Sequence, residues 1–289
     1  MKEIKRTFIL GEEWLYYKIY CGCYSADTVL IENILPIVEE LLQRKLIDQW
    51  FFIRYHDPKN HLRLRFHLPN AGNLQEIIKL AQPYFSKFIE KDIVYDIVTA
   101  TYKREIERYG KRTIMEAEKL FYCHSEKTLQ LIDNTTPAHD EIARIFSSLQ
   151  MIDDLLEEFE ISLTHRQEFT HSMQLQFKEE HNIGKDNTKK LDHLYRNYRA
   201  EILLFLTEKQ EPQYLEGLIE IIKTKEEEAK IIKTILSKIK ENGTTASLEL
   251  IASLIHMNIN RVFRSKQRQY EMLCYDFMNR YYKTRLARK

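Results

Sequence analysis

Four cationic or titratable side chains recur at every second position in the stretch HLRLRFH, residues 61–67. They are His61, Arg63, Arg65 and His67. Because successive side chains of a strand point to opposite faces, the spacing predicts one cationic and one apolar strand face. Arginine binds a carboxylate through two parallel hydrogen bonds and keeps its charge, so this face suits an anionic ligand. The alternative is a surface strand whose arginines pair with nearby carboxylates.

A second chemical group lies in the stretch YKREIERYGKR, residues 102–112. Glu105 and Arg108 are three residues apart and would share one side of a helical turn, where they could simply pair with each other. Tyr109-Gly110 predicts a break in the chain, which would hold Arg108 at the edge of an element and within reach of a ligand.

A third group lies in the stretch SLIHMNINRVF, residues 253–263. His256 and Asn260 are four residues apart and share a helix side, and Arg261 follows. A single histidine on a helix is more often structural than catalytic. Together, however, the three groups supply fixed cations, a carboxylate and a side chain that titrates near neutrality, which suits proton removal next to a carbonyl. We therefore expect them to form one pocket.

The composition of the chain argues against several other classes of function. The chain has 289 residues, 44% of them hydrophobic, and a net charge of +1 from 44 basic and 43 acidic residues. No overall field favours nucleic acid or membrane binding, and no apolar run reaches the roughly 18 residues of a membrane span. We expect a cytoplasmic protein with reduced cysteines. Phosphate-binding, dinucleotide and zinc-protease motifs are missing from the sequence, so we expect neither a cofactor nor a metal.

The elements that would position these groups follow an α+β pattern. The sequence predicts a strand in WLYYKIYCG, a helix over 28–45 capped by Asp27 and kinked at Pro36, and strands in QWFFIRY and HLRLRFHL. A helix over 73–91 and a strand from 94 to 102 complete the order β-α-β-β-α-β. That order is typical of a ferredoxin-like antiparallel sheet with helices on one face.

The rest of the chain is predicted to be mainly α-helical. We expect helices from Thr136, which would be the cap, to about 159, and near 187–208, 212–240, 246–259 and 262–286. The stretch ENGTTAS, residues 241–247, would end one helix and cap the next, and residues 171–187 would be a loop or lid. We interpret residues 1–289 as a single domain with an α+β subregion, 1–112, and a helical subregion, 113–289.

Four stretches carry a resemblance to a known family. WLYYKIYCG, QWFFIRYHDPKNHLRLRFHL, REIERYG and SLIHMNINR, in this order, resemble the C-terminal elimination domain of nisin-type (class I) lanthipeptide dehydratases, which also occurs as stand-alone chains in thiopeptide-type pathways. The resemblance runs from about Trp14 to the C-terminal helices, although residues 135–245 carry no matching motif. It implies a lyase without a cofactor, which removes glutamate from glutamylated Ser and Thr side chains of a precursor peptide and leaves dehydroalanine or dehydrobutyrine.

The resemblance also implies roles for individual residues. The family's elimination residues correspond here to a set expected to be catalytic: Arg63, Arg65, Glu105, Arg108 and His256. Further residues are expected to contact the substrate: Arg54, His61, Asn260 and Arg261. The base is either His256 or Glu105. Lys111 stands where the family often has a second glycine, which leaves the backbone beside Arg108 uncertain.

The expected partners are a glutamylated precursor peptide and a separate glutamyl-tRNA-dependent protein that installs the ester, with no direct contact to nucleic acid. A homodimer is left open. Two other functions compete with elimination. One is the formal [4+2] cycloaddition that builds a pyridine ring in thiopeptides, and the other is non-catalytic binding of a leader peptide by strand addition to the sheet edge.

Overall fold

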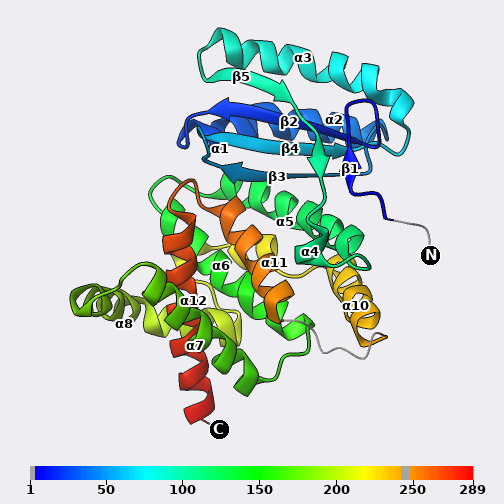
Figure 1. Ribbon diagram of the computed structural model, residues 1–289. Coiled ribbons are helices and arrows are strands. Elements are labelled where there is room, and N and C mark those ends of the chain that lie inside the picture. The colour runs from blue at the N-terminus through cyan, green and yellow to red at the C-terminus, as the bar shows by residue number, and fades with distance from the viewer. Residues whose placement is uncertain (1–3, 242–247, 289) are drawn as a thin grey trace. The chain divides into compact units, whose positions relative to one another are not determined.

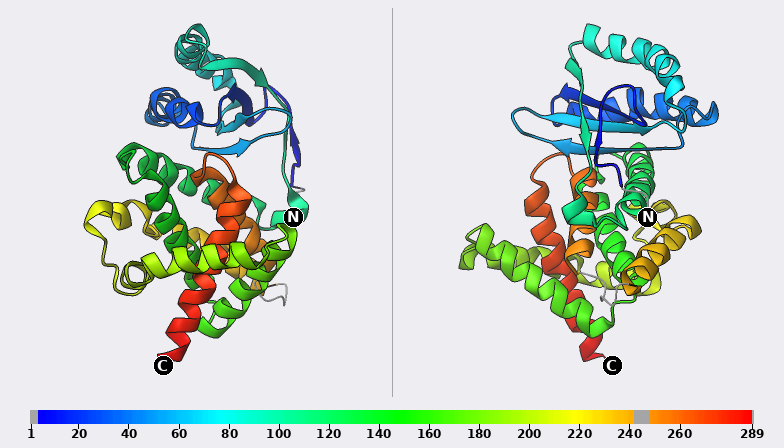
Figure 2. Two further views of the ribbon diagram at one scale, coloured as in Figure 1. Left: turned by 90° about the vertical axis from the view of Figure 1, so that its left-hand side faces the viewer. Right: turned by 45° about the vertical axis from the view of Figure 1, so that its right-hand side comes forward.

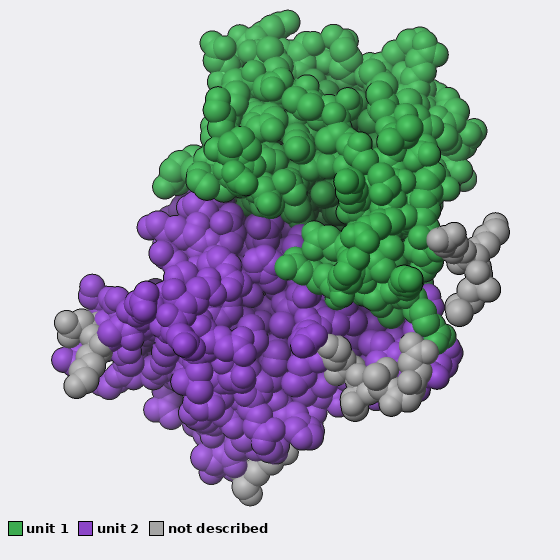
Figure 3. Space-filling model, viewed as in Figure 1, with its two compact units in different colours: residues 1–133 green, residues 134–289 purple. Residues whose placement is uncertain are grey.

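The computed structural model describes residues 4–241 and 248–288, and the chain divides into two compact units, Met1–Asp133 and Asn134–Lys289 (Figure 3). The protein is α+β, mostly helical with small antiparallel sheets, as the sequence predicted. The boundary between the units falls near the end of the helix Ile114–Asn134, about 20 residues beyond the expected end of the α+β subregion at residue 112. The two units are described separately below.

Unit 1 is built on a four-stranded sheet with the order β3-β4-β2-β5, in which all neighbours are antiparallel (Figure 1). Its strands are β2 (Trp14–Cys21), β3 (Gln49–Tyr55), β4 (His61–His67) and β5 (Val94–Thr99). A second, two-stranded sheet pairs β1 (Thr7–Phe8) with β6 (Tyr102–Lys103). In the central pairings, Arg65 of β4 lies opposite Tyr16 of β2 and Phe51 of β3. Arg63 lies opposite Lys18 and Ile53.

Helices cover one face of this sheet (Figure 2). They are α1 (Ser25–Val29), a π-helical segment (Leu30–Ile34), α2 (Leu35–Gln43), a 3₁₀ turn (Ala71–Asn73) and α3 (Leu74–Glu90). The apolar side chains of β4, Leu62, Leu64 and Phe66, are at most 1% exposed and belong to the core beneath these helices. The alternation in HLRLRFH thus directs the apolar residues to the helices and the cationic residues to the other face.

The first helical segment differs from its prediction at both Asp27 and Pro36. Asp27 does not cap a helix: it lies inside α1, 7% exposed, and accepts a hydrogen bond from Arg54. Pro36 lies in the first turn of α2, directly after the π-helical segment. Proline lacks the backbone N–H that a helix interior needs, so the chain starts a new helical segment there.

The outer edge of β3 is covered by α5 (Ile114–Asn134), a helix of the same unit. Ser125 Oγ accepts a hydrogen bond from the backbone N–H of Phe52 at 3.2 Å, and the Trp50 indole donates to Glu126 at 2.6 Å. The bond to Ser125 satisfies a backbone N–H that an open sheet edge would leave unpaired, and the bond to Glu126 adds a side-chain contact between β3 and α5. They also explain why unit 1 extends to residue 133 rather than ending near residue 112.

The regular secondary structure in the described residues of unit 2 is helical. Its α-helices are α6 (Asp140–Glu158), α7 (Leu163–Glu180), α8 (Lys185–Glu208), α9 (Leu218–Ile222), α10 (Glu226–Lys240), α11 (Leu248–Val262) and α12 (Gln267–Ala287), with a 3₁₀ turn at Gln213–Leu215. The long helix α12 packs against α7, and α11 packs against α6. Within residues 4–241 and 248–288, none of the helices combines the length and apolar character needed to cross a bilayer.

Three helix predictions for unit 2 require correction. The first helix begins at Asp140, because residues 136–139 form a turn in which the His139 N–H bonds to the Thr136 carbonyl. Residues 171–180 belong to α7 rather than to a loop; this helix is polar, and Gln174 bonds to Asp276 and Asn279 of α12. The predicted helix 212–240 is divided into α9 and α10, since Lys223 has an extended backbone. The predicted cap in 241–247 lies almost entirely outside the described residues.

A buried ion pair stabilises unit 1 where the two-stranded sheet β1-β6 meets α5. Glu118 of α5, 1% exposed, accepts two hydrogen bonds from Arg104 at 2.7 and 2.6 Å and one from the Tyr102 hydroxyl at 2.7 Å. Removing one partner of such a pair leaves the other charge buried and uncompensated.

We therefore expect Glu118→Gln to lower the free energy of unfolding of unit 1 by about 3 kcal/mol. A urea titration followed by tryptophan fluorescence measures this, since both tryptophans, Trp14 and Trp50, lie in unit 1. Glu107→Gln is the matched control: Glu107 also pairs with an arginine, Arg6, but at the exposed surface. Its unfolding midpoint should stay close to that of the wild type. If both variants lower the free energy of unfolding equally, the buried pair does not stabilise unit 1 more than the exposed pair does.

Candidate functional site

The two arginines of the cationic β4 face have no acidic partner among the described residues, whereas His67 on the same face pairs with Asp48 at 2.6 Å. Neither Arg63 nor Arg65 lies within 4.0 Å of a carboxylate in residues 4–241 and 248–288. The residue opposite Arg63 on β2 is another cation, Lys18. Like charges directly across a strand pair are destabilising, so the sheet concentrates positive charge here without compensating it. This observation favours an anion-binding face over a surface network of ion pairs.

Arg65 is the more deeply placed of the two arginines, at 7% exposure. Three aromatic rings surround its guanidinium: the distances from the guanidinium carbon to the ring centroids are 4.4 Å for Tyr16, 5.1 Å for Phe51 and 4.9 Å for Tyr102. Its Nε and Nη1 atoms are buried and lack a hydrogen-bond partner in the described chain. Burial lowers the pKa of Arg65, yet a guanidinium remains charged at neutral pH. Arg65 is therefore a buried cation with two unsatisfied hydrogen-bond donors.

Arg63 is partly exposed and is held from two sides. Its guanidinium carbon lies 3.3 Å from the ring centroid of Tyr55 on β3. Its Nε–H donates to Nε2 of His61, two residues earlier on β4, at 3.2 Å. Its two terminal nitrogens form the edge that can bind a carboxylate bidentately.

Glu105 precedes α4 (Ile106–Tyr109) in the same unit, Arg108 lies within it, and the two side chains pair at 3.2 Å. Both side chains are well exposed, at 62% and 45%, so this contact contributes little stability. The charge of Glu105 also acts on the pKa of Arg65, so Glu105 belongs to the same electrostatic neighbourhood. The break predicted at Tyr109-Gly110 is present. Gly110 has φ +77°, and a Cβ there would lie 2.8 Å from Thr113 Oγ1, so only glycine fits.

Arg54 lies on the other face of the sheet from Arg63 and Arg65. It is 4% exposed and donates to Asp27 at 2.5 Å in the core beneath the helices. Its cross-strand neighbour on β4 is Leu62. This placement favours an internal ion pair over the expected contact with the substrate.

In unit 2, His256 of α11 forms a pair with Glu271 of α12. The distance from His256 Nδ1 to Glu271 Oε2 is 2.8 Å, and the Glu271 side chain is 2% exposed while that of His256 is 29% exposed. Arg268 donates to the same Glu271 oxygen at 3.0 Å. An ionised carboxylate only accepts hydrogen bonds, so Nδ1 carries a proton in this pair, and in the neutral tautomer Nε2 presents a lone pair. This arrangement can accept a proton at Nε2 and stabilise the resulting imidazolium.

Sequence reasoning missed Glu271. It lies 15 residues after His256 on the next helix, and no spacing rule within one helix connects them. Of the other expected residues on α11, Asn260 is partly exposed one turn after His256. Arg261 is fully buried and donates to the carbonyl of Met257 at 2.8 Å. Arg261 is thus held inside unit 2 rather than presented to a ligand.

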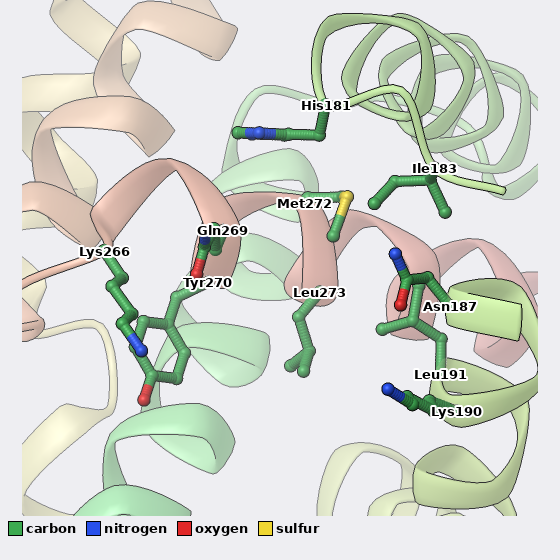
Figure 4. Close-up of a pocket in the computed structure, with 10 residues that line it drawn as sticks. All are labelled: His181, Ile183, Asn187, Lys190, Leu191, Lys266, Gln269, Tyr270, Met272 and Leu273. Carbon is green, nitrogen blue, oxygen red and sulfur yellow. The ribbon is translucent and has the colours of Figure 1, made fainter.

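A pocket of about 470 Å³ lies elsewhere on unit 2, between α12, α8 and the end of α7 (Figure 4). Its lining includes Gln269, Tyr270, Met272 and Leu273 of α12 and Lys266 directly before this helix. Neither His256 nor Glu271 lines this pocket. Across the described residues, no group of His, Cys, Asp or Glu is arranged to hold a metal ion.

Solved structures share this fold. The lantibiotic dehydratase MibB from Microbispora sp. 107891 aligns over 96% of the present chain and 28% of its own, with a TM-score of 0.71 and 18% identity. TsrL aligns over 95% of both chains, with a TM-score of 0.62 and 13% identity. The pyridine synthase TbtD from thiomuracin biosynthesis has a TM-score of 0.60 and 10% identity, over 94% of this chain and all of its own. At these identities the likeness concerns the fold alone.

Sequence relatives are found among lantibiotic biosynthesis proteins. The subtilin biosynthesis protein SpaB of Bacillus subtilis is 26% identical over 255 residues, 87% of this chain. The nisin biosynthesis protein NisB of Lactococcus lactis subsp. lactis is 29% identical over 129 residues, 43% of this chain and 12% of its own length. The chain spans about a quarter, 24%, of the length of SpaB.

The family model for the C-terminal part of the lantibiotic biosynthesis dehydratase matches residues 14–282, almost the whole chain. The match covers both β4, with its two arginines, and the helices that carry His256 and Glu271. The resemblance found in the sequence motifs is therefore confirmed, and the chain belongs to the lantibiotic dehydratase C-terminal family.

Proposed function

We propose that this chain is a lyase that eliminates glutamate from glutamylated Ser and Thr side chains of a precursor peptide, forming dehydroalanine or dehydrobutyrine. The observation that carries the proposal is the pair Arg63 and Arg65, which share one sheet face without a carboxylate within 4.0 Å in the described residues. Such a face suits a substrate that contains one carboxylate and releases a second. Family membership supports the same class of reaction.

The proposed reaction divides between two chemical tasks. A base removes the α-proton of the esterified residue, the Cα–Cβ double bond forms, and the Cβ–O bond breaks so that glutamate leaves as a carboxylate. Arg63 and Arg65 would hold the glutamyl carboxylate and the negative charge that develops on the leaving oxygen. His256, oriented by Glu271, would move the proton through Nε2. Glu105 is the second candidate for the base, and its ion pair with Arg108 could equally serve to orient Arg108.

The sheet of unit 1 supports the assignment of anion binding to Arg63 and Arg65. The order β3-β4-β2-β5 with antiparallel neighbours is the basis on which we infer a ferredoxin-like sheet for unit 1. The helices between β2 and β3 and between β4 and β5 lie on the apolar face, so the part of the other face beside the partly exposed Arg63 would remain for the peptide. The ester itself must be formed first, and we propose that a glutamyl-tRNA-dependent protein supplies the glutamylated peptide.

The direct test is incubation of the purified chain with a glutamylated precursor peptide, followed by mass spectrometry. The expected result is loss of one glutamic acid per modified residue, which leaves the peptide one water lighter than its unmodified form at that position. A peptide that stays glutamylated would contradict the proposal. The fold shared with a pyridine synthase makes cycloaddition the competing activity, so a peptide that already carries dehydroamino acids is tested in parallel. Macrocycle formation there, without elimination, would favour cycloaddition.

His256→Ala should lower the turnover of elimination by about 10²–10⁴-fold, the usual contribution of a positioned acid or base, while peptide binding stays near that of the wild type. Glu271→Gln should cause a smaller loss, because Nε2 remains but its orientation and the stabilisation of the imidazolium are weakened. His193→Ala is the control, since His193 is an exposed histidine of α8 in the same unit. Unchanged turnover in His256→Ala would exclude it as the proton-transfer group.

Arg65→Met should weaken the binding of free L-glutamate, the proposed product, by about 10–100-fold, because hydrogen bonds to a buried charge are lost while the packing against aromatic rings is kept. Isothermal titration calorimetry measures this directly. Arg6→Met is the control, since Arg6 is an exposed arginine of unit 1 that already pairs with Glu107. Equal affinities in Arg65→Met and the wild type would argue against Arg65 as an anion ligand.

A further inference from the structure

His61 at the start of β4 makes two hydrogen bonds that together define its protonation. Nδ1 lies 2.8 Å from the carbonyl oxygen of Lys59, and Nε2 lies 3.2 Å from Nε of Arg63. A carbonyl oxygen can only accept, so Nδ1 must carry a proton. The Nε–H of arginine can only donate, so Nε2 must present its lone pair. Only the neutral imidazole with its proton on Nδ1 satisfies both bonds.

The surroundings of His61 stabilise this neutral form. The ring is 3% exposed and lies between Tyr20 of β2 and Tyr55 of β3, with centroid distances of 4.7 and 5.4 Å. Burial is the main cause that lowers the pKa of His61 below its ordinary value, and the charges of Arg63 and Lys18 act in the same direction. The bond to the Lys59 carbonyl and the charge of Asp57 oppose this shift without reversing it.

His61 and Tyr55 together fix the guanidinium of Arg63. Tyr55 lies against its plane, with 3.3 Å from the guanidinium carbon to the ring centroid, and His61 holds its Nε edge. A flexible arginine would have to lose rotamer freedom on binding an anion, whereas this one is already ordered. The terminal nitrogens of Arg63 are thereby left facing away from His61.

We propose that His61 is a positioning residue, which acts as a neutral hydrogen-bond acceptor that aims the terminal nitrogens of Arg63 at the substrate carboxylate. The inference rests on the proposed function and assigns His61 a role different from the substrate contact expected from the sequence. Its burial leaves almost no surface for a ligand, so its effect reaches the substrate through Arg63.

The hydrogen bond itself is tested by NMR on protein labelled with ¹⁵N in histidine and arginine, with the His61→Gln spectrum used to assign the His61 signals. At neutral pH, His61 should be the neutral tautomer protonated on Nδ1, and a scalar coupling should connect Arg63 Nε with His61 Nε2. A charged ring, or a proton on Nε2, would overturn the proposal. This measurement does not depend on the activity of the chain.

The consequence for function is tested with three variants and two readouts, KM for the glutamylated peptide and the Kd of free L-glutamate. His61→Phe keeps a buried ring without an acceptor, and both constants should rise about tenfold while kcat changes by less than threefold. His61→Gln offers a carbonyl oxygen where Nε2 lies, so it should recover most of the loss. His67→Phe is the matched control on the same strand face, where His67 bonds to Asp48 instead.

The outcomes separate this inference from the proposed function. If wild-type protein leaves the glutamylated peptide intact, the proposed function fails, and the NMR measurement still decides whether His61 holds Arg63. If the wild type eliminates glutamate but His61→Phe behaves like His67→Phe, the positioning role is wrong. A glutamine variant no better than the phenylalanine variant, in protein with an unchanged unfolding midpoint, would also overturn it.

Discussion

The burial of the Arg65 guanidinium without an acidic partner in the described chain is the constraint on which the site in unit 1 depends. Removing a charge from water costs several kcal/mol unless an opposite charge or hydrogen bonds compensate it. Contacts with aromatic rings return only about 0.5–2 kcal/mol each. Two other buried arginines of the same unit, Arg54 and Arg104, do have carboxylate partners, Asp27 and Glu118. The contrast supports our proposal that an anionic ligand pairs with Arg65.

Several elements must be in place before Arg65 has this environment. Tyr16 comes from β2 and Phe51 from β3, each directly across from Arg65 in the antiparallel register. Tyr102 comes from β6, and its hydroxyl is held by Glu118 of α5. A slip of one residue in either central pairing would turn the cationic side chains into the apolar core, so the packing of Leu64 and Phe66 beneath the helices also maintains the site.

The two units contribute different kinds of chemistry. Unit 1 supplies charges that do not change near neutral pH, because arginine stays protonated. Unit 2 supplies the first candidate for the proton-transfer group, His256, whose ring orientation is set by the buried Glu271. Even within unit 1, the histidine beside Arg63 is held neutral and serves orientation. The type of each residue alone would not reveal this division.

The sequence by itself determined the features that depend on local spacing. The alternation in HLRLRFH defined both faces of β4, the Tyr109-Gly110 break ended α4, and the family motifs identified most of the candidate residues. Helix α7 escaped prediction because its packing uses polar residues such as Gln174, which leave no apolar period. Only the tertiary structure decided which charges are paired: it joined Arg54 to Asp27 and His256 to Glu271, and left Arg65 without an acid in the described chain. Periodicity acts over a few residues, whereas the choice of partner depends on how distant segments pack.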